Sequence, residues 1–528
     1  MKKKFNFIIY SCLIVLFAAI YYLSLPVLNI MFYGLPFFVT LIGITILIVE
    51  SNKNGIPNIP GLIITALGLV FLTIVPLFTT PAIGRSDRYM NIIGEVEESL
   101  FIEDISPVDV DKIRLVDQDM ASKLGDKTIG QDPALGSSSY VGNFNIQTYR
   151  GELYWVAPLL HRSFFKWLSN KEGSKGYIMV SATNPQDVRL VQDKGFIKYQ
   201  PDAYFSQDLK RHIYFNGFIN KGFTDYTFEI DDDGKPYWVI SQYKKVIGYS
   251  GKDVEKTILI DAQNGTLSSY TVDKTPKWVD RIQPEEFVID QVNNWGKFKK
   301  GFWNSILAEE GVQRLTPGIS LVYGKDGVSY WYSGVTSVGA DDSTIGFILV
   351  NSRTKEFKYY KQSGATETAA MGSAEGKVQE KGYYATFPIM YNIVGRPTYV
   401  LSLKDNAGLI KMISMISVED YTVLGIGETT EEALRNYKSA LKRTLSGADI
   451  RESLNIKAIN GVIERINSDI FKGDSFYYFT LQGVKNRTFT LTSQISKDII
   501  LTEPNDYVEI KYEESDSDIL EVSEYIRR

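Results

Sequence analysis

The stretch GKPYWV at residues 234–239, followed by KTILI at residues 256–260, carries the pattern that decides the fold. Its leading glycine permits a tight turn, its aromatic and β-branched residues suit a half-buried pleated surface, and the returning apolar run supplies a partner strand. The chain contains four such pairs: residues 151–156 with 176–180, 234–239 with 256–260, 327–332 with 346–350, and 395–400 with 411–415. We therefore predict four antiparallel strand pairs.

Helical patterns alternate with these strand pairs. Thr429 and Glu432 form a capping-box arrangement, which marks the start of a helix. Further strands are expected before the glycine at residues 226–230 and 319–323. The expected helices cover Pro201 to His212, Pro284 to Leu307, Thr366 to Glu380, Thr429 to Leu445, and a segment that begins at Ser106-Pro107 and continues through Ile113, Val116, Met120 and Leu124 to Gly125. The pattern predicts an α+β fold of repeated helix-plus-antiparallel-sheet units.

Length and composition indicate a globular protein of several domains. The chain has 528 residues, of which 44% are hydrophobic, and a formal net charge of -5. This mild acidity gives no broad attraction to nucleic acid or anionic lipid. The single cysteine, Cys12, excludes an intramolecular disulfide, and the two histidines, His161 and His212, exclude a histidine-rich metal site. We expect both histidines on the surface or in loops.

Three apolar runs near the N-terminus predict three transmembrane helices. They cover residues 5–25, 27–49 and 62–78, each close to the ~20 residues that cross a bilayer as a helix. Lys2, Lys3, Lys4 and Lys53 favour a cytoplasmic N-terminus, whereas Arg85 and Arg88 oppose it. We therefore expect a membrane anchor at residues 1–80, a linker at residues 81–100, and an extracytoplasmic soluble region. A cleaved signal peptide is the alternative for the first run, although no small-residue cleavage site follows it.

One repeat carries a family resemblance. The stretch TILIDAQNGTL at residues 257–267 resembles the terminal hairpin of a PepSY domain, which has an apolar run, an aspartate and a glycine turn. This resemblance implies small helix-plus-sheet modules of exported or membrane-attached bacterial proteins, some of which restrain peptidases. PepSY-like repeats 1 and 2 are expected at residues 101–282, and repeats 3 and 4 at residues 283–450. The segment from Tyr383 to Asp405 also resembles large bacterial membrane proteins of unknown activity.

The C-terminal segment, residues 455–528, predicts a small β-barrel. Five short strand-like runs occur between Ile456 and Tyr525, and residues 505–510 are similar to the strand entry of OB-fold domains. Such domains often bind single-stranded nucleic acid on a basic, aromatic face. Here nine basic and thirteen acidic residues follow from Asn455 onward, so nucleic-acid binding is not expected. Tyr477, Tyr478 and Phe479 are expected to serve the core rather than to stack bases.

The sequence predicts no catalytic, cofactor-binding or metal-ligating residue, because no phosphate loop, zinc helix or nucleophile elbow occurs. Weaker candidates have plainer interpretations. Residues 425–427 (GIG) are expected as a turn before a helix, and Asp231 to Asp233 as a solvated hairpin turn. Glu285 and Glu286 suit the first turn of a helix, and Asp341-Asp342 suits a loop tip.

The aromatic residues of the four strand pairs form one candidate interaction surface. Trp155, Trp238, Trp331 and Tyr399 occupy similar places in the repeats. If they face outward together, they form a recognition stripe for a partner; if neighbouring units cover them, they are packing residues.

These observations together predict a non-catalytic scaffold or protein-interaction protein, anchored in the membrane of the bacterial envelope. Its expected partners are the lipid bilayer and another protein or a second copy of itself, and regulation of an envelope peptidase is a narrower form of this function. Two alternatives stay open: a hydrolase of envelope polymers, and a cytoplasmic-facing membrane protein that binds nucleic acid. No cofactor is expected.

Overall fold

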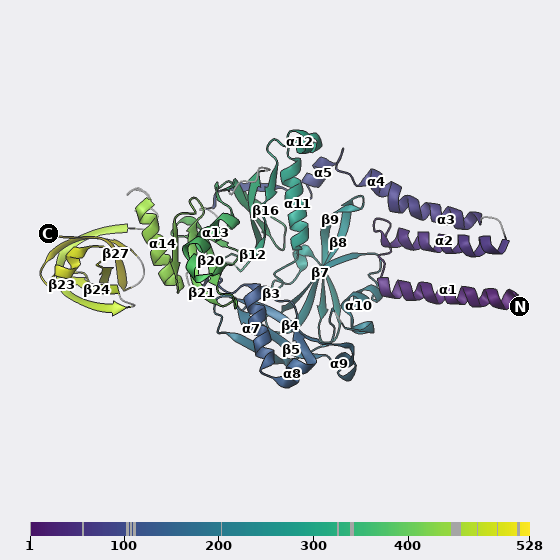
Figure 1. Ribbon diagram of the computed structural model, residues 1–528, viewed down its shortest axis with the longest axis horizontal. Helices are drawn as coiled ribbons and strands as arrows, with labels where there is room; N and C mark the ends of the chain where they lie inside the picture. The colour runs from purple at the N-terminus through teal and green to yellow at the C-terminus, as the bar shows by residue number, and fades with distance from the viewer. Residues whose placement is uncertain are drawn as a thin grey trace.

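The computed structural model describes residues 2–54, 58–101, 105, 108, 112–201, 203–324, 327–337, 343–444, 456–471, 474–493, 495–514 and 518–528. The molecule is elongated, with N-terminal helices at one end and a C-terminal barrel at the other (Figure 1). Four larger sheets and their helices lie between these ends. The two chain termini therefore lie far apart along the long axis.

The first two sheets come from the first half of the chain. Sheet 1 has the order β2-β4-β5-β6 with β3 also paired to β4: β2 (Ser139–Val141), β3 (Asn145–Tyr149), β4 (Glu152–His161), β5 (Ser174–Ser181) and β6 (Val188–Ile197). Sheet 2 has the order β10-β9-β8-β7: β7 (Gly222–Ile230), β8 (Pro236–Ile247), β9 (Ser250–Asp261) and β10 (Leu267–Thr271).

The next two sheets follow in sequence. Sheet 3 has the order β1-β16-β15-β13-β11 with β12 also paired to β13: β1 (Val96–Ser99), β11 (Gln313–Leu315), β12 (Ser320–Tyr323), β13 (Ser329–Ser337), β15 (Gly346–Asn351) and β16 (Phe357–Tyr360). Sheet 4 has the order β18-β20-β21-β22 with β19 also paired to β20: β18 (Tyr384–Ala385), β19 (Ile389–Ile393), β20 (Arg396–Lys404), β21 (Ile410–Ser417) and β22 (Leu424–Gly427). Strands β14 (Ser343–Thr344) and β17 (Gly364–Ala365) form a separate pair.

The prediction of four antiparallel strand pairs is confirmed, with the four aromatic residues at matching positions. Trp155 lies opposite Val180, Trp238 opposite Ile260, Trp331 opposite Val350, and Tyr399 opposite Ile416. The additional strands expected at residues 226–230 and 319–323 are part of β7 and β12.

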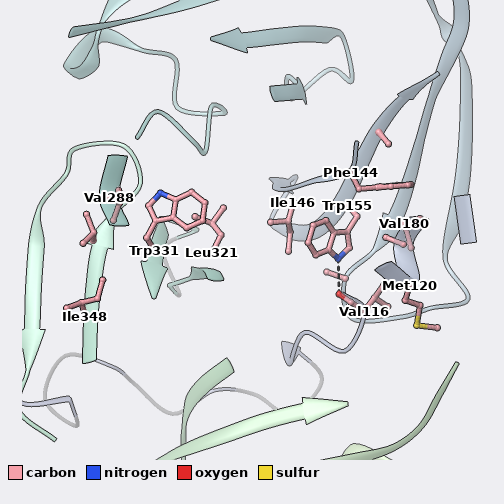
Figure 2. Packing of buried hydrophobic residues seen from close by; sticks show 14 of the residues in the cluster. Val116, Met120, Phe144, Ile146, Trp155, Val180, Val288, Leu321, Trp331 and Ile348 are labelled. Atoms are coloured by element: carbon pink, nitrogen blue, oxygen red, sulfur yellow. Dashed lines mark hydrogen bonds between the residues drawn. The ribbon is translucent and has the colours of Figure 1, made fainter. Parts of the chain in front are cut away.

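Both faces of these sheets are buried, because alternate residues of one strand enter different cores. On β4, Val156 packs with Trp238 of sheet 2, whereas Trp155 belongs to a core that includes Trp331 of sheet 3. In the same way, Tyr332 of sheet 3 shares a core with Tyr399 of sheet 4. The shared cores therefore order the molecule as sheet 2, sheet 1, sheet 3 and sheet 4, and Figure 2 shows residues of the core that joins sheets 1 and 3.

The helices cover the remaining faces and edges. In chain order they are α5 (Ser86–Met90), α7 (Gln118–Gly130), α8 (Pro133–Ser138), α9 (Phe164–Ser169), the short η3 (Phe205–Gln207), α10 (Leu209–Phe215), η4 (Val272–Lys274), α11 (Glu285–Phe298), α12 (Gly301–Leu307), α13 (Glu367–Lys377), η5 (Gln379–Lys381) and α14 (Thr430–Thr444). Helix α14 packs on the outer face of sheet 4 through Tyr437 and Leu441. Phe287 of α11 packs on the outer face of sheet 2.

Most helix predictions are confirmed with shifted ends. Helix α13 and helix α14 match their predictions, and the Glu432 amide donates to Thr429 Oγ1 at 3.3 Å as in a capping box. Two helices, α11 and α12, take the place of the single helix expected at residues 284–307. In the region of the helix expected from Pro201 to His212, the α-helical part is α10, Leu209–Phe215. Helix α7 begins after its N-cap Asp117 rather than at Ser106-Pro107, which lies outside the described residues. Residues 81–100, expected as a linker, contain α5 and β1, and β1 joins sheet 3.

The C-terminal barrel is confirmed. Strands β23 (Ile456–Phe471), β24 (Asp474–Leu481), β25 (Thr488–Thr492), β27 (Ile519–Arg527) and β26 (Tyr507–Glu513) close in this order, with η6 (Lys497–Leu501) before β26. Its core includes Phe479, Phe489 and Val508, all buried. This five-stranded closure is consistent with an OB-like barrel.

The prediction of three membrane-spanning helices is wrong. In the described part of the chain, one helical stretch, Ile59–Thr79, is long and apolar enough to cross a membrane. It comprises α3 (Ile59–Leu69), the π-helical turn η1 (Val70–Ile74) and α4 (Val75–Thr79). Within α1 (Lys2–Ser24) and α2 (Gly34–Asn54), the apolar helical parts found among the described residues are Tyr10–Ser24 and Gly34–Glu50, each of 10–17 residues. Since a helix rises 1.5 Å per residue, 17 residues cover about 26 Å, less than the hydrocarbon thickness of about 30 Å.

Strand β22 and helix α14 approach closely at Gly425. A Cβ atom at this position would lie 2.0 Å from the backbone nitrogen of Tyr437. We expect Gly425→Ala to lower the free energy of unfolding by about 1–3 kcal/mol, the usual cost of overpacking a core. The measurement is the urea midpoint of the full chain in detergent, with tryptophan fluorescence as the signal of unfolding.

Gly372→Ala is the matched control, because Gly372 lies on helix α13 and a Cβ atom added there would have no other atom within 4 Å. This substitution should raise stability by about 0.5–1 kcal/mol through helix propensity. Equal midpoints for both variants would show that the strand and the helix do not touch at Gly425.

Candidate functional site

The four aromatic residues of the predicted interaction surface are buried. Trp155 is 7% exposed, Trp238 3%, Trp331 3% and Tyr399 1%. A partner cannot reach side chains that are buried this deeply. These residues therefore pack in the cores, and they do not form the exposed recognition stripe that was the other alternative. The sheets cover these residues because each sheet is packed on both faces.

Each of the four aromatic side chains also donates a hydrogen bond to a backbone carbonyl. Nε1 of Trp155 donates to Val116 O at 2.8 Å (Figure 2), and Nε1 of Trp331 donates to Gln283 O at 2.9 Å. Each acceptor directly precedes the N-cap of a helix, α7 and α11 respectively. The remaining two bonds are Trp238 Nε1 to Tyr199 O at 2.7 Å and Tyr399 OH to Ala365 O at 3.1 Å. The aromatic residues therefore fix the chain where it enters a helix.

A polar junction that the sequence did not indicate lies where three sheets meet. Asp280 Oδ2 accepts a 2.6 Å hydrogen bond from the amide of Thr148 in sheet 1. The Asp280 amide donates to Glu229 Oε2 in sheet 2 at 3.1 Å. Its carbonyl accepts from Ser329 and Ser352 of sheet 3 and the turn after β15, each at 2.6 Å. One residue thus connects three sheets.

Burial changes the acidity of both carboxyl groups in this junction. Desolvation, followed by the charge of Asp280, raises the pKa of Glu229 to about 8. Desolvation also raises the pKa of Asp280 to about 7, although the Thr148 amide and the Arg353 charge oppose this shift. The hydrogen bond from the Asp280 amide and then the charge of Arg281 lower the pKa of Glu229 by smaller amounts. Both groups are almost completely buried.

These raised pKa values predict a stability that depends on pH. Because both values exceed those of unfolded chains, about 4.3 and 3.9, the folded state binds more protons between about pH 4 and 8. The stabilisation is fully present below about pH 4 and is lost as the pH rises through 7 to 8. We expect the urea midpoint to fall from pH 5 to pH 9, with a loss on the order of a few kcal/mol.

Glu229→Gln should flatten this decline, because the neutral amide can still accept the bond from the Asp280 amide. Glu286→Gln is the matched control, since Glu286 is an exposed partner of Lys252 and should leave the decline unchanged. A midpoint of Glu229→Gln that falls as steeply as that of the unmodified chain would contradict the assignment.

The weaker sequence candidates occupy structural positions. Asp231 Oδ1 accepts from the amides of Asp233 and Lys235 and so closes the predicted hairpin turn. Glu285 and Glu286 lie in the first turn of α11, as expected. The GIG stretch at residues 425–427 is part of strand β22 rather than a turn. Asp341-Asp342 lies outside the described residues.

The two histidines are placed differently from each other. His212 lies on α10, and its Nε2 is 2.7 Å from the Gly265 carbonyl oxygen. His161, expected on the surface or in a loop, is instead buried at the end of β4, with 8% of its surface exposed. Its Nε2 atom has no hydrogen-bond partner, and burial lowers its pKa. The apolar run that precedes His161 is the sequence signal for this burial.

Among the residues that the structure describes, no group of three or more His, Cys, Asp and Glu residues could hold a metal ion. No protein-family profile matches the chain, and no curated protein matches its sequence.

Proposed function

We propose that this protein is a non-catalytic scaffold of the bacterial envelope, which holds its C-terminal barrel away from a membrane for another protein to bind. One observation carries the proposal. The apolar helix and the barrel lie at opposite ends of a continuous stack of sheets that share cores (Figure 1). Such a stack suits a spacer better than a hinge, because shared cores resist rearrangement.

The stretch Ile59–Thr79 supports a membrane end for this spacer. Only 17% of its apolar window is buried inside the molecule, so it is not a core helix of the soluble part. Aromatic and basic side chains gather beside the neighbouring helices, where Lys245 lies 4.6 Å from the ring centre of Phe32 and 5.3 Å from that of Tyr33. Aromatic rings with nearby lysines are typical of the interface between membrane and water.

The distribution of basic residues around this helix favours an extracytoplasmic stack. Lys2, Lys3, Lys4 and Lys53 precede the helix, and positive charge tends to stay in the cytoplasm. Arg88 follows the helix, but its Nη2 donates to the Val246 carbonyl at 2.8 Å and is thereby held on the soluble part. The resemblance of residues 257–267 to PepSY hairpins agrees with an exported protein, and restraint of an envelope peptidase is the narrower form of the proposal.

The barrel offers an exposed apolar patch for a protein partner. Leu501 is 70% exposed and Ile500 55%. Arg527 Nη1 donates to the Leu501 carbonyl at 2.6 Å, which places this pair beside the end of β27, where Ile526 is also exposed. Exposed apolar patches commonly mark protein interaction sites.

The location can be tested with single cysteines. We would introduce Lys377→Cys on α13 and Lys497→Cys on the barrel into a Cys12→Ser background; both lysines are exposed. A membrane-impermeant maleimide should label both positions in intact cells if the stack is extracytoplasmic. Lysed cells serve as the control for reactivity. Labelling only after lysis would contradict the proposed location.

The interaction can be tested by photo-crosslinking in cells. A photoreactive amino acid at Leu501 or Ile526 should give a discrete adduct, because both side chains belong to the exposed patch. The same amino acid at Lys377 on α13, which packs on the core between sheets 3 and 4, is the matched control. An adduct of twice the chain mass would identify self-association, and another mass a different partner. Absence of adducts at both barrel positions would contradict the proposed contact face.

A further inference from the structure

A polar cavity lies at one edge of sheet 1. It has a volume of about 670 Å³, within the usual range for small-molecule sites. Its lining comes from four parts of the chain: helix α8 with the first residue of β2, the end of β4, helix α9 and the turn after it, and the β5–β6 pair. A ligand in this cavity would therefore contact segments that only the folded sheet brings together.

An irregularity in sheet 1 shapes this cavity. Lys175 of β5 pairs with Phe196 of β6, but the next pair on the ladder is Tyr177 with Val191. The residues between Val191 and Phe196 are thus left outside the regular ladder, and two of them, Gln192 and Gly195, line the cavity. Bulges of this kind re-aim side chains and are frequent beside functional sites.

Glycine is required at this bulge. Gly176 has a φ of +88°, and a Cβ atom there would lie 1.9 Å from the Val191 carbonyl oxygen. The bulge is also held from outside, because Gln263 in the turn of sheet 2 donates to the Lys194 carbonyl. The wall of the cavity is therefore fixed by backbone geometry and by a neighbouring sheet.

The floor of the cavity contains an unsatisfied donor or acceptor. His161 lines the cavity, is more than nine-tenths buried, and has an Nε2 atom without a partner in the structure. The surroundings hold this residue in place: Gln200 Oε1 accepts from the His161 amide at 3.1 Å, and Gln200 Nε2 donates to Ser174 Oγ at 2.8 Å. A buried polar atom without a partner destabilises the fold, and a ligand atom that pairs with it removes this cost.

Two cations lie at the cavity. Lys166 and Lys175 both line it and are exposed, and neither has an ion-pair partner among the described residues. The opposing charge is Asp132, one of whose oxygens already caps α8 by accepting from the amides of Ala134 and Leu135. The cavity therefore has excess positive charge above a neutral polar floor.

We propose that this cavity binds a small anionic ligand, whose carboxylate or phosphate group lies between Lys166 and Lys175 and whose polar group pairs with His161 Nε2. This site goes beyond the scaffold function and does not depend on it. Carboxylate and phosphate share the required charge and acceptor oxygens. The probe that binds distinguishes a carboxylate ligand from a phosphate ligand.

The two histidines make the test direct, because each gives its own ring signals in the NMR spectrum. The full chain in detergent, with ring-labelled histidine, would be titrated with N-acetylglycine and with glycerol phosphate at constant ionic strength. We expect one of these probes to shift the His161 signal to saturation while the His212 signal stays in place. A His212→Gln variant assigns the two signals.

Exposed lysines provide variants that should still fold. Lys166→Ala with Lys175→Ala should weaken probe binding about tenfold or more, whereas Lys377→Ala on α13 should leave it unchanged. The neutral N-acetylglycinamide should bind far more weakly than N-acetylglycine if the carboxylate is recognised. Binding of phosphate alone would assign a phosphate ligand. No shift of His161 with either anion, or affinity unaffected by the double lysine variant, would overturn the proposal.

Discussion

The hydrogen bonds of Asp280 are the constraint on which the arrangement of the sheets depends. This residue lies in the segment between sheet 2 and α11, and its side chain, amide and carbonyl each reach a different sheet. Neighbouring bonds strengthen the same junction: Gln147 of β3 pairs in both directions with the backbone of Ile230 in β7, at 2.9 and 2.8 Å. Buried polar groups are costly when they lose a partner, so a displacement of any one sheet would leave several of them unpaired. The junction therefore specifies one arrangement of the three sheets.

The aromatic residues apply a similar constraint within each unit. A tryptophan or tyrosine at the same place in four strand pairs donates to the carbonyl of a segment that leads to a helix. A buried indole or phenol needs such an acceptor, and a carbonyl outside a helix or sheet needs a donor. Between the units, Lys404 of sheet 4 is buried and forms a 2.5 Å ion pair with Asp117, the N-cap of α7. Polar contacts thus connect the units that the apolar cores bring together.

Local patterns predicted the elements, but not how they combine. The glycine-led strand pairs, helix α14 with its capping box, and the five barrel strands follow from periodicity and turn residues that lie close together in sequence. The membrane prediction failed because each apolar run was taken as one continuous helix, whereas α2 begins only at Gly34 and the described apolar helices Tyr10–Ser24 and Gly34–Glu50 are shorter than a span of ~20 residues. Alternation alone left open whether the aromatic residues form a surface or pack in a core, because it does not show whether a neighbouring unit covers the outer face of each sheet. The continuous apolar run from Leu153 to Leu160 indicated instead that both faces are buried. Asp280 and His161 acquire their environments from residues distant in sequence, which no local pattern contains.

Burial of both sheet faces limits where function can lie. A sheet with one free face can present a broad surface to a partner, but here the faces are occupied by other sheets or by helices α11 and α14. Among the described residues, sheet edges, bulges and the two ends of the stack then offer accessible positions. The cavity beside His161 is built at a bulge, the exposed apolar patch is at the barrel end, and the membrane-length helix is at the other end. A rigid interior with distinct sites at its margins agrees with the proposed scaffold role, because a close-packed interior keeps such sites at fixed distances from one another.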